Sequence, residues 1–188
     1  ASIQKSAAVK ADELTVITGA NTLDYDAGLL TEKVADAKTK PTVAIDTAAL
    51  GGMYGNSISM IATEAGVGVN NAGTIQAANG LFIDAAGKLS NNGTIKTTGV
   101  DAKAPSLLNI HSNQAISNSK AIEGSGNIVV VADASYDNHN TGIIVQSNAA
   151  NKGKVHIAAT SFVGGNEVAG AHINDPCCQF RTVKLGRF

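Results

Sequence analysis

A short motif of Asn, Gly, Thr and Ile recurs along the chain at a spacing that suits stacked β-coils. Asn-Ala-Gly-Thr-Ile ends at Ile75, and Asn-Asn-Gly-Thr-Ile ends 20 residues later at Ile95. A degenerate copy, Ile-Ser-Asn-Ser-Lys-Ala-Ile, ends a further 27 residues on at Ile122. The preceding strand-like run shifts by the same 27 residues, from Ile83 to Ile110. Self-similarity at such a period indicates a repeat architecture, in which one unit stacks on the next.

Short runs of strand length lie between the repeats. They are rich in β-branched residues, alternate apolar with polar positions, and are bounded by Gly, Asn or Ser. Helical spacing is absent except in residues 28–40, a charged segment expected to be an inserted loop or short helix. Strands this close together leave no room for βαβ crossovers, so the pattern predicts an all-β solenoid with coils of about 20–27 residues. The runs are 57–62, 80–85, 107–112, 127–132, 142–147 and 154–159.

Stacking assigns an architectural role to the repeated residues. Equivalent positions of successive coils lie over one another, so the recurring isoleucines are predicted to form an inward structural ladder. Asn and Gly are predicted at the coil corners, because Asn side chains bond turn backbone and Gly fits tight bends. The ladder residues are Ile75, Ile95 and Ile122; the corner residues are Asn70, Asn71, Gly73, Asn91, Asn92 and Gly93.

The composition gives information on the binding partners, the core and the cysteine chemistry of the chain. Only 15% of the 188 residues are charged and the formal net charge is −1, so bulk electrostatics favours neither nucleic acid nor anionic lipid. Aromatic residues make up 4% of the chain and Trp is absent, which favours a thin core of Ala, Val, Ile and Leu. No apolar run is long enough to predict a transmembrane helix. The two cysteines, Cys177 and Cys178, are adjacent and cannot form a disulfide framework.

Residues 43–75 resemble a known family. The matching strings are Ile-Asp at 45–46, Ala-Leu-Gly-Gly-Met-Tyr at 49–54 and Thr-Glu-Ala-Gly-Val-Gly-Val at 63–69, followed by the Asn-Ala-Gly-Thr-Ile repeat. Together they resemble the end of the secretion domain of two-partner-secretion exoproteins of the filamentous haemagglutinin and contact-dependent growth-inhibition family. The resemblance implies a right-handed parallel β-helix. It also implies secretion through a partner outer-membrane transporter to the surface of a Gram-negative bacterium.

The resemblance also suggests a domain organisation. Residues 1–75 are expected to end a secretion-type β-helix domain that carries the charged loop near 28–40, and residues 76–170 to form haemagglutinin-type repeats. The family's Asn-Pro-Asn-type motifs are absent, so transporter recognition is expected to depend on sequence upstream of this chain. Residues 171–188 leave the Asn/Gly/Thr rhythm and are expected to be a cap, a junction to an unrelated module, or a tail of artificial origin.

Candidate chemistry is sparse. Asp84 and His111 share the 27-residue offset and are predicted to face outward, with no second carboxylate or Arg beside them. That pair alone is expected to be surface decoration, so no catalytic residue is assigned and the chain is predicted not to be an enzyme. His172 and the two cysteines lack the spacing and the fourth ligand of a zinc site, so no metal or cofactor is assigned.

The sequence therefore favours a structural shaft of a secreted surface filament, serving adhesion or presentation of a distal toxin or effector. Its expected partners are the transporter and a host or bacterial surface receptor, for which a glycan is one candidate. A carbohydrate-binding or carbohydrate-cleaving β-helix is the alternative, although glycan sites usually present aromatic platforms and this chain has few aromatic residues. A third hypothesis makes the chain only a carrier for whatever follows Phe188.

Overall fold

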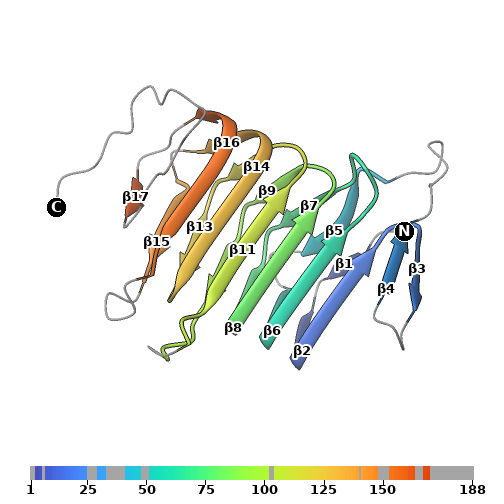
Figure 1. The fold of residues 1–188 in the computed structure, drawn as a ribbon, viewed down its shortest axis with the longest axis horizontal. Helices are drawn as coiled ribbons and strands as arrows, with labels where there is room; N and C mark the ends of the chain where they lie inside the picture. Colours follow the sequence, from blue (N-terminus) through green and yellow to red (C-terminus); the bar gives the residue numbers. More distant parts are fainter. Residues whose placement is uncertain are drawn as a thin grey trace.

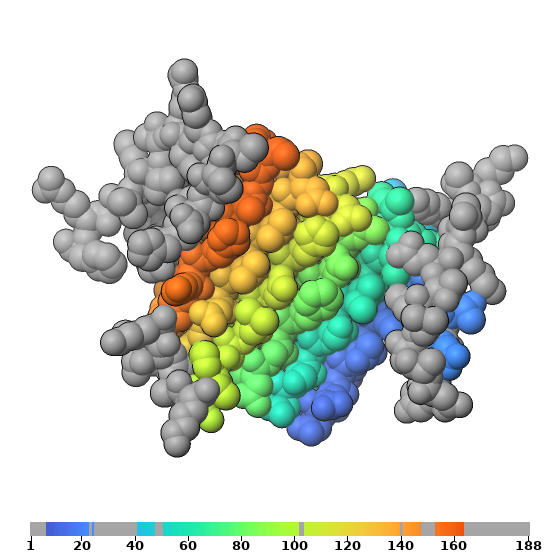
Figure 2. Space-filling model, in the orientation of Figure 1, coloured from blue at the N-terminus to red at the C-terminus, as the bar shows by residue number. Residues whose placement is uncertain are grey.

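The chain folds as an all-β solenoid of parallel coils (Figure 1). The computed structural model describes residues 3–5, 7–24, 29–32, 41–47, 51–101, 104–139, 141–147, 153–163 and 167–169. Within these residues there is no helix, and strands from successive coils pair in parallel along the stack. The predicted parallel β-helix is confirmed. Figure 2 shows the coils as adjacent diagonal strips that run in sequence order from one end to the other.

Three sheets run along the solenoid, and each coil contributes one segment to each sheet. The first sheet contains the second halves of the long strands β2 (Ala8–Thr18), β6 (Gly52–Ala62) and β8 (Thr74–Ala85). Strand β11 (Leu107–Ser112), the first part of β14 (Asn127–Asn138) and the first part of β16 (Val155–Val163) continue it. We call its solvent side the outer face, and it is the face on which the candidate site lies.

The other two sheets complete each coil. The second sheet continues from the first halves of β6 and β8, and the third ends on the last residues of β14 and β16. The second sheet also contains β10 (Thr94–Thr97), β13 (Ala121–Gly124), β15 (Ile143–Gln146) and β17 (Glu167–Ala169). The third sheet also contains β1 (Ile3–Lys5), β5 (Val43–Thr47), β7 (Gly68–Asn71), β9 (Leu89–Asn91) and β12 (Ile116–Asn118).

An antiparallel hairpin interrupts the first coil. Strands β3 (Asn21–Asp24) and β4 (Leu29–Glu32) pair only with each other, beside the early coils in Figure 1. The insertion lengthens this coil, since the Thr63 hydroxyl donates to the Thr18 carbonyl 45 residues earlier in the chain. The structure corrects the sequence expectation here, because Leu29–Glu32 is a strand and not part of a loop or short helix. The remainder of the predicted loop, residues 33–40, lies outside the described residues.

Inward-facing aliphatic side chains fill the space between the sheets. In the second sheet Ile75 pairs with Ile95, and Ile95 pairs with Ile122. All three side chains are buried, and Ile144 of the next coil continues the row. At the late end of the third sheet the rings of Tyr136 and Phe162 stack with centroids 5.2 Å apart. Each coil therefore buries its apolar side chains against the equivalent side chains of the neighbouring coils. Together these rows form the hydrophobic core of the solenoid.

A buried asparagine ladder runs beside the isoleucines inside the third sheet. Asn71 Nδ2 donates to Asn91 Oδ1, Asn91 Nδ2 to Asn118 Oδ1, and Asn118 Nδ2 to Asn138 Oδ1, each over 2.8 Å. The four asparagines are 20, 27 and 20 residues apart, and all are buried. The first three also donate to a backbone carbonyl, as Asn91 Nδ2 does at Ala121. The ladder thus satisfies polar groups that would otherwise be costly to bury.

The structure places the other predicted corner residues at or next to the ladder. Asn70 faces outward on β7 and donates to Asp46 Oδ1, whereas Asn92 is exposed in the bend after β9. Gly73 and Gly93 occupy equivalent bends of successive coils, where Thr94 N–H donates to the Gly73 carbonyl. Gly93 has no positive φ, so its small size is needed for close coil stacking and not for backbone freedom.

The early end of the asparagine ladder is unfinished, which gives a first prediction. Asn71 Oδ1 is buried without a hydrogen-bond partner, and so is the Oγ1 of Thr47, its paired residue one coil earlier. We expect Thr47→Asn to supply the missing donor and to raise the free energy of unfolding by about 1 kcal/mol, the usual net worth of one such bond. Urea unfolding followed by circular dichroism measures it.

Thr47→Val is the matched control for this prediction. It removes the unpaired hydroxyl but cannot donate, so we expect its effect to be smaller than that of Thr47→Asn. Equal stabilisation by the two variants would show that loss of the hydroxyl, and not extension of the ladder, is responsible.

Strand β8 runs across the predicted boundary between residues 75 and 76, and the two-segment division stays a prediction. The predicted tail, residues 171–188, lies outside the described residues together with His172, Cys177 and Cys178. Among the described residues there is no helix of the length and apolarity needed to cross a membrane.

Candidate interaction surface

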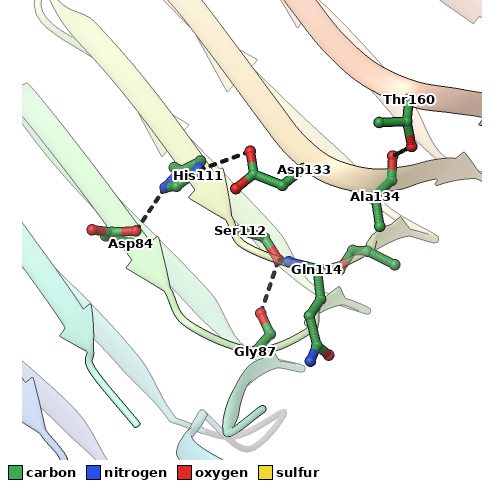
Figure 3. Close-up of polar contacts among 9 residues, drawn as sticks. Asp84, Gly87, His111, Ser112, Gln114, Asp133, Ala134 and Thr160 are labelled. Atoms are coloured by element: carbon green, nitrogen blue, oxygen red, sulfur yellow. Dashed lines mark hydrogen bonds and ion pairs between the residues drawn. The ribbon is translucent and has the colours of Figure 1, made fainter. Parts of the chain in front are cut away.

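The outer face carries the polar cluster that the sequence singled out. Alternation turns Ile83 and Ile110 inward on β8 and β11, and therefore turns Asp84 and His111 outward. These two residues pair across the strands, and His111 Nδ1 lies 2.8 Å from Asp84 Oδ1 (Figure 3). The Asp84 side chain is 39% exposed and the His111 side chain is 32% exposed, which agrees with the predicted outward orientation.

Asp133 joins the cluster from the opposite side, which corrects the expectation that no second carboxylate lies there. Its Oδ1 is 3.3 Å from His111 Nε2 (Figure 3). Sequence spacing missed it because the residue paired with His111 is Val131, and Asp133 lies two positions on. The pairing of β14 with β16 shifts register just there, between Ala132 and Ser135. We call the three side chains the His111 bridge, because they link three consecutive coils.

The contacts of His111 with Asp84 and Asp133 favour the doubly protonated form of its imidazole. A neutral imidazole has one donor nitrogen and one acceptor, so only the doubly protonated ring can donate to both carboxylates. Partial burial alone would lower the pKa of His111, but the hydrogen bonds and charges of Asp84 and Asp133 outweigh it and raise that pKa above the ordinary value of 6.5. The bridge therefore stabilises the fold below about pH 6.5. Its contribution is lost as the pH rises through the folded-state pKa.

This raised pKa gives a second prediction. We expect Asp84→Asn to lower the pKa of His111, because the amide keeps the shape of the carboxylate and removes its charge. Proton NMR titration of the imidazole measures the change, with His111→Gln used to assign the resonance. Asp137→Asn is the matched control, because Asp137 contacts His139 and not His111. An unchanged His111 pKa in Asp84→Asn would show that the carboxylate does not hold the proton.

A second histidine lies among residues that resemble a catalytic triad in kind but not in arrangement. Ser117 Oγ is 2.9 Å from His139 Nε2, and Asp137 Oδ2 is 3.5 Å from that same nitrogen. A triad needs the serine on one ring nitrogen and the carboxylate on the other. With both groups on Nε2, the carboxylate cannot orient the ring for proton transfer from the serine. The sequence did not indicate this cluster, since its residues come from consecutive coils.

A hollow of about 280 Å³ opens on the outer face near the early coils. Its floor is low because Gly80, Ser57 and Ser59 carry small side chains or none, and its walls are Phe82 and Leu107. These walls are 37% and 45% exposed, in contrast to the buried apolar residues of the core. We call it the Gly80 hollow. Its lining consists of Glu13, Leu14, Thr15, Ser57, Ile58, Ser59, Gly80, Leu81, Phe82, Leu107 and Asn109.

Sequence reasoning missed this hollow because its residues come from four coils, and no single run carries a signal. Among the described residues, no group of three or more His, Cys, Asp or Glu side chains is placed so that it could bind a metal ion. The outer face therefore offers a proton-dependent bridge and a hollow, both made by stacking residues from separate coils.

Comparisons with known proteins identify the family of this chain. The profile of the TPS secretion domain matches residues 1–97. The toxin CdiA of Yersinia pestis is 39% identical over 127 residues, covering 67% of this chain and 4% of that protein. The tRNA nuclease CdiA of Yersinia mollaretii is 32% identical over 175 residues, covering 84% of this chain and 6% of that protein. No solved structure matches the chain significantly.

These matches cover the solenoid and only a small part of the relatives. The chain spans about one twentieth of the length of the two Yersinia proteins. A TPS domain implies a secreted protein and a transporter that secretes it. The profile covers more than half of the chain, and one relative above 30% identity covers more than two thirds of it. The chain therefore belongs to the contact-dependent growth-inhibition family of two-partner-secretion proteins.

Proposed function

We propose that this chain is part of the structural shaft of a secreted surface filament, which serves adhesion or the presentation of a distal toxin or effector. The observation that supports this most directly is the continuous register of the coils. On the first sheet Ile83, Ile110, Val130 and Ile157 pair in succession without a break. A stack that transmits one register from coil to coil is suited to holding a distal part at a distance.

The shaft proposal includes the absence of catalysis in this chain. The relatives are named as toxins or tRNA nucleases, but the chain covers only 4% and 6% of the first two. We propose that the toxic activity belongs to parts that have no counterpart here. Both histidine clusters of the described residues support this view, because His111 is held between two carboxylates and His139 meets both partners on one nitrogen.

The proposal also names location and partners. We place the chain on the cell surface of a Gram-negative bacterium after passage through the outer-membrane transporter of its two-partner system. The distal contact is proposed to be a receptor on a host or bacterial surface, with a glycan as one candidate. Nucleic acid is not a proposed partner of this segment, because its net charge of −1 supplies no bulk electrostatic attraction to phosphates.

Deletion of one coil tests the shaft. Removing residues 96–122 takes out 27 residues and puts Ile95 in the place of Ile122, so Asn91 would stack on Asn138. We expect the shortened chain to fold. We also expect the full secreted protein with this deletion, co-expressed with its transporter and carrying an epitope after Phe188, to display the tag on the cell surface. Circular dichroism and surface immunofluorescence measure the two results.

An out-of-register deletion is the control. Removing residues 96–108 joins Ile95 of the second sheet directly to Asn109 of the first sheet. The corner between the two sheets is lost and the following strands fall out of register with the coil below, which should abolish both folding and display. If the 27-residue deletion also prevented folding, the coils would not be interchangeable units and the shaft proposal would fail. If it folded but stayed inside the cell, the missing coil would be needed for export and not for spacing.

A further inference from the structure

The Gly80 hollow has the features of a binding site, because its polar side chains are not used by the protein. Among the described residues, the side chains of Glu13, Thr15, Ser57, Ser59 and Asn109 make no hydrogen bond or ion pair. Some outward polar groups on other parts of the solenoid are paired across coils. Free polar groups beside exposed apolar walls are typical of ligand sites.

Three outward polar side chains elsewhere on the solenoid form hydrogen bonds between adjacent coils. Asn70 donates to Asp46, Asn79 donates to Asn56, and the Thr141 hydroxyl donates to the Ser119 carbonyl, each across adjacent coils. In these three places a polar side chain of one coil therefore bonds to the next coil. At the Gly80 hollow the absent side chain leaves space, since the closest atom to a Cβ added at Gly80 would be Ser57 Oγ at 3.8 Å.

The walls favour an apolar group as occupant. Phe82 and Leu107 are two of the few large apolar side chains that the described surface exposes, and they stand on neighbouring strands β8 and β11. Covering both with an aliphatic or aromatic side chain would remove apolar surface from water. The hollow of about 280 Å³ has room for one such side chain.

The charge of the rim favours a basic neighbour for that group. Glu13 is exposed and, among the residues that the structure describes, it is the one charged residue that lines the hollow, with no Lys, Arg or His beside it in the lining. One carboxylate beside two exposed apolar walls complements an apolar side chain that lies next to a cation.

We propose that the Gly80 hollow is a docking site for an extended segment of a partner protein that presents an apolar side chain next to Lys or Arg. The apolar side chain packs between Phe82 and Leu107, and the cation pairs with Glu13. The serine and threonine hydroxyls are free to bond the backbone of the segment. This inference concerns a surface that the shaft proposal does not use, so either can fail without the other.

Three matched dipeptides provide the test: N-acetyl-Phe-Lys-amide, N-acetyl-Phe-Gln-amide and N-acetyl-Phe-Glu-amide, titrated into the isotope-labelled 188-residue chain by NMR. We expect saturable shifts at Gly80, Phe82 and Asn109. The Lys peptide should bind about two- to fivefold more tightly than the Gln peptide, the range of an exposed ion pair, and the Glu peptide more weakly.

Two variants and one control assign the effect to the site. Glu13→Gln should remove the preference for Lys and leave binding of the Gln peptide unchanged. Gly80→Leu should fill the hollow and abolish binding of all three peptides. Asp12→Asn, an exposed acid beside Glu13 that does not line the hollow, should keep the preference.

Three results would overturn the proposal. One is the absence of saturable shifts at these residues for all three peptides. Another is equal affinity for the Lys and Glu peptides. The last is that oligosaccharides such as maltohexaose shift these residues while the peptides do not, which would identify a glycan site instead.

Discussion

Asn91→Ala is expected to lower the free energy of unfolding by about 3 kcal/mol. The substitution removes the acceptor of Asn71 Nδ2 and the donor to Asn118 Oδ1, and both groups are buried. It also frees the Ala121 carbonyl, which Asn91 Nδ2 contacts at 3.1 Å. Buried polar groups without a partner each cost about 1–3 kcal/mol, so the loss exceeds that of one ordinary hydrogen bond. Urea unfolding followed by circular dichroism measures it.

The adjacent residue provides the control. Asn92 has the same side chain and lies in the same copy of the motif, but it is exposed. Asn92→Ala should change stability by less than about 0.5 kcal/mol, as for most surface substitutions. Equal losses for Asn91→Ala and Asn92→Ala would contradict a specific role for the buried ladder.

Gly93→Ala is expected to cost about 3 kcal/mol for a steric reason, at the upper end of the range for overpacked sites. A Cβ on Gly93 would lie 2.8 Å from the Ala72 carbonyl carbon, and it would also collide with the Gly73 carbonyl oxygen of the preceding coil. These are backbone atoms that cannot rotate away, so the two coils must move apart. Thermal or urea unfolding of the variant measures the loss.

Gly80→Ala is the matched control for this prediction. Its added Cβ would meet nothing closer than Ser57 Oγ at 3.8 Å, and its φ is not in the left-handed region. We expect Gly80→Ala to be neutral or slightly stabilising, because it reduces the entropy of the unfolded chain. A large loss in Gly80→Ala would instead show that these glycines are needed for backbone conformation.

Much of the fold could be predicted from the repeat because stacking in register makes the period visible. The 20- and 27-residue offsets between Ile75, Ile95 and Ile122 are the pairings of β8, β10 and β13. Strand runs were also found, but the alternation of a single run does not show which sheet it joins. The run at 142–147 resembles the others, yet β15 lies on the second sheet and not the first.

The candidate site was harder to predict because it depends on neighbours across coils. Asp84 and His111 share one offset and were found, whereas Asp133 approaches from a shifted register and was missed. The asparagines were expected to bond corner backbone, and their bonds to each other inside the stack were not foreseen. Hairpin β3–β4 was missed because two four-residue strands carry too little alternation to be recognised.

The asparagine ladder has a direction, and its last member closes it. Every bond runs from the amide of one coil to the oxygen of the following coil, but Asn138 Nδ2 turns to the Gly142 carbonyl of its own corner, 2.7 Å away. Asn138 Nδ2 therefore does not need an asparagine oxygen from the next coil as its acceptor. Strand β16 nevertheless continues the stack through Val163. A count of repeats based on this asparagine would therefore end before the stack of coils does.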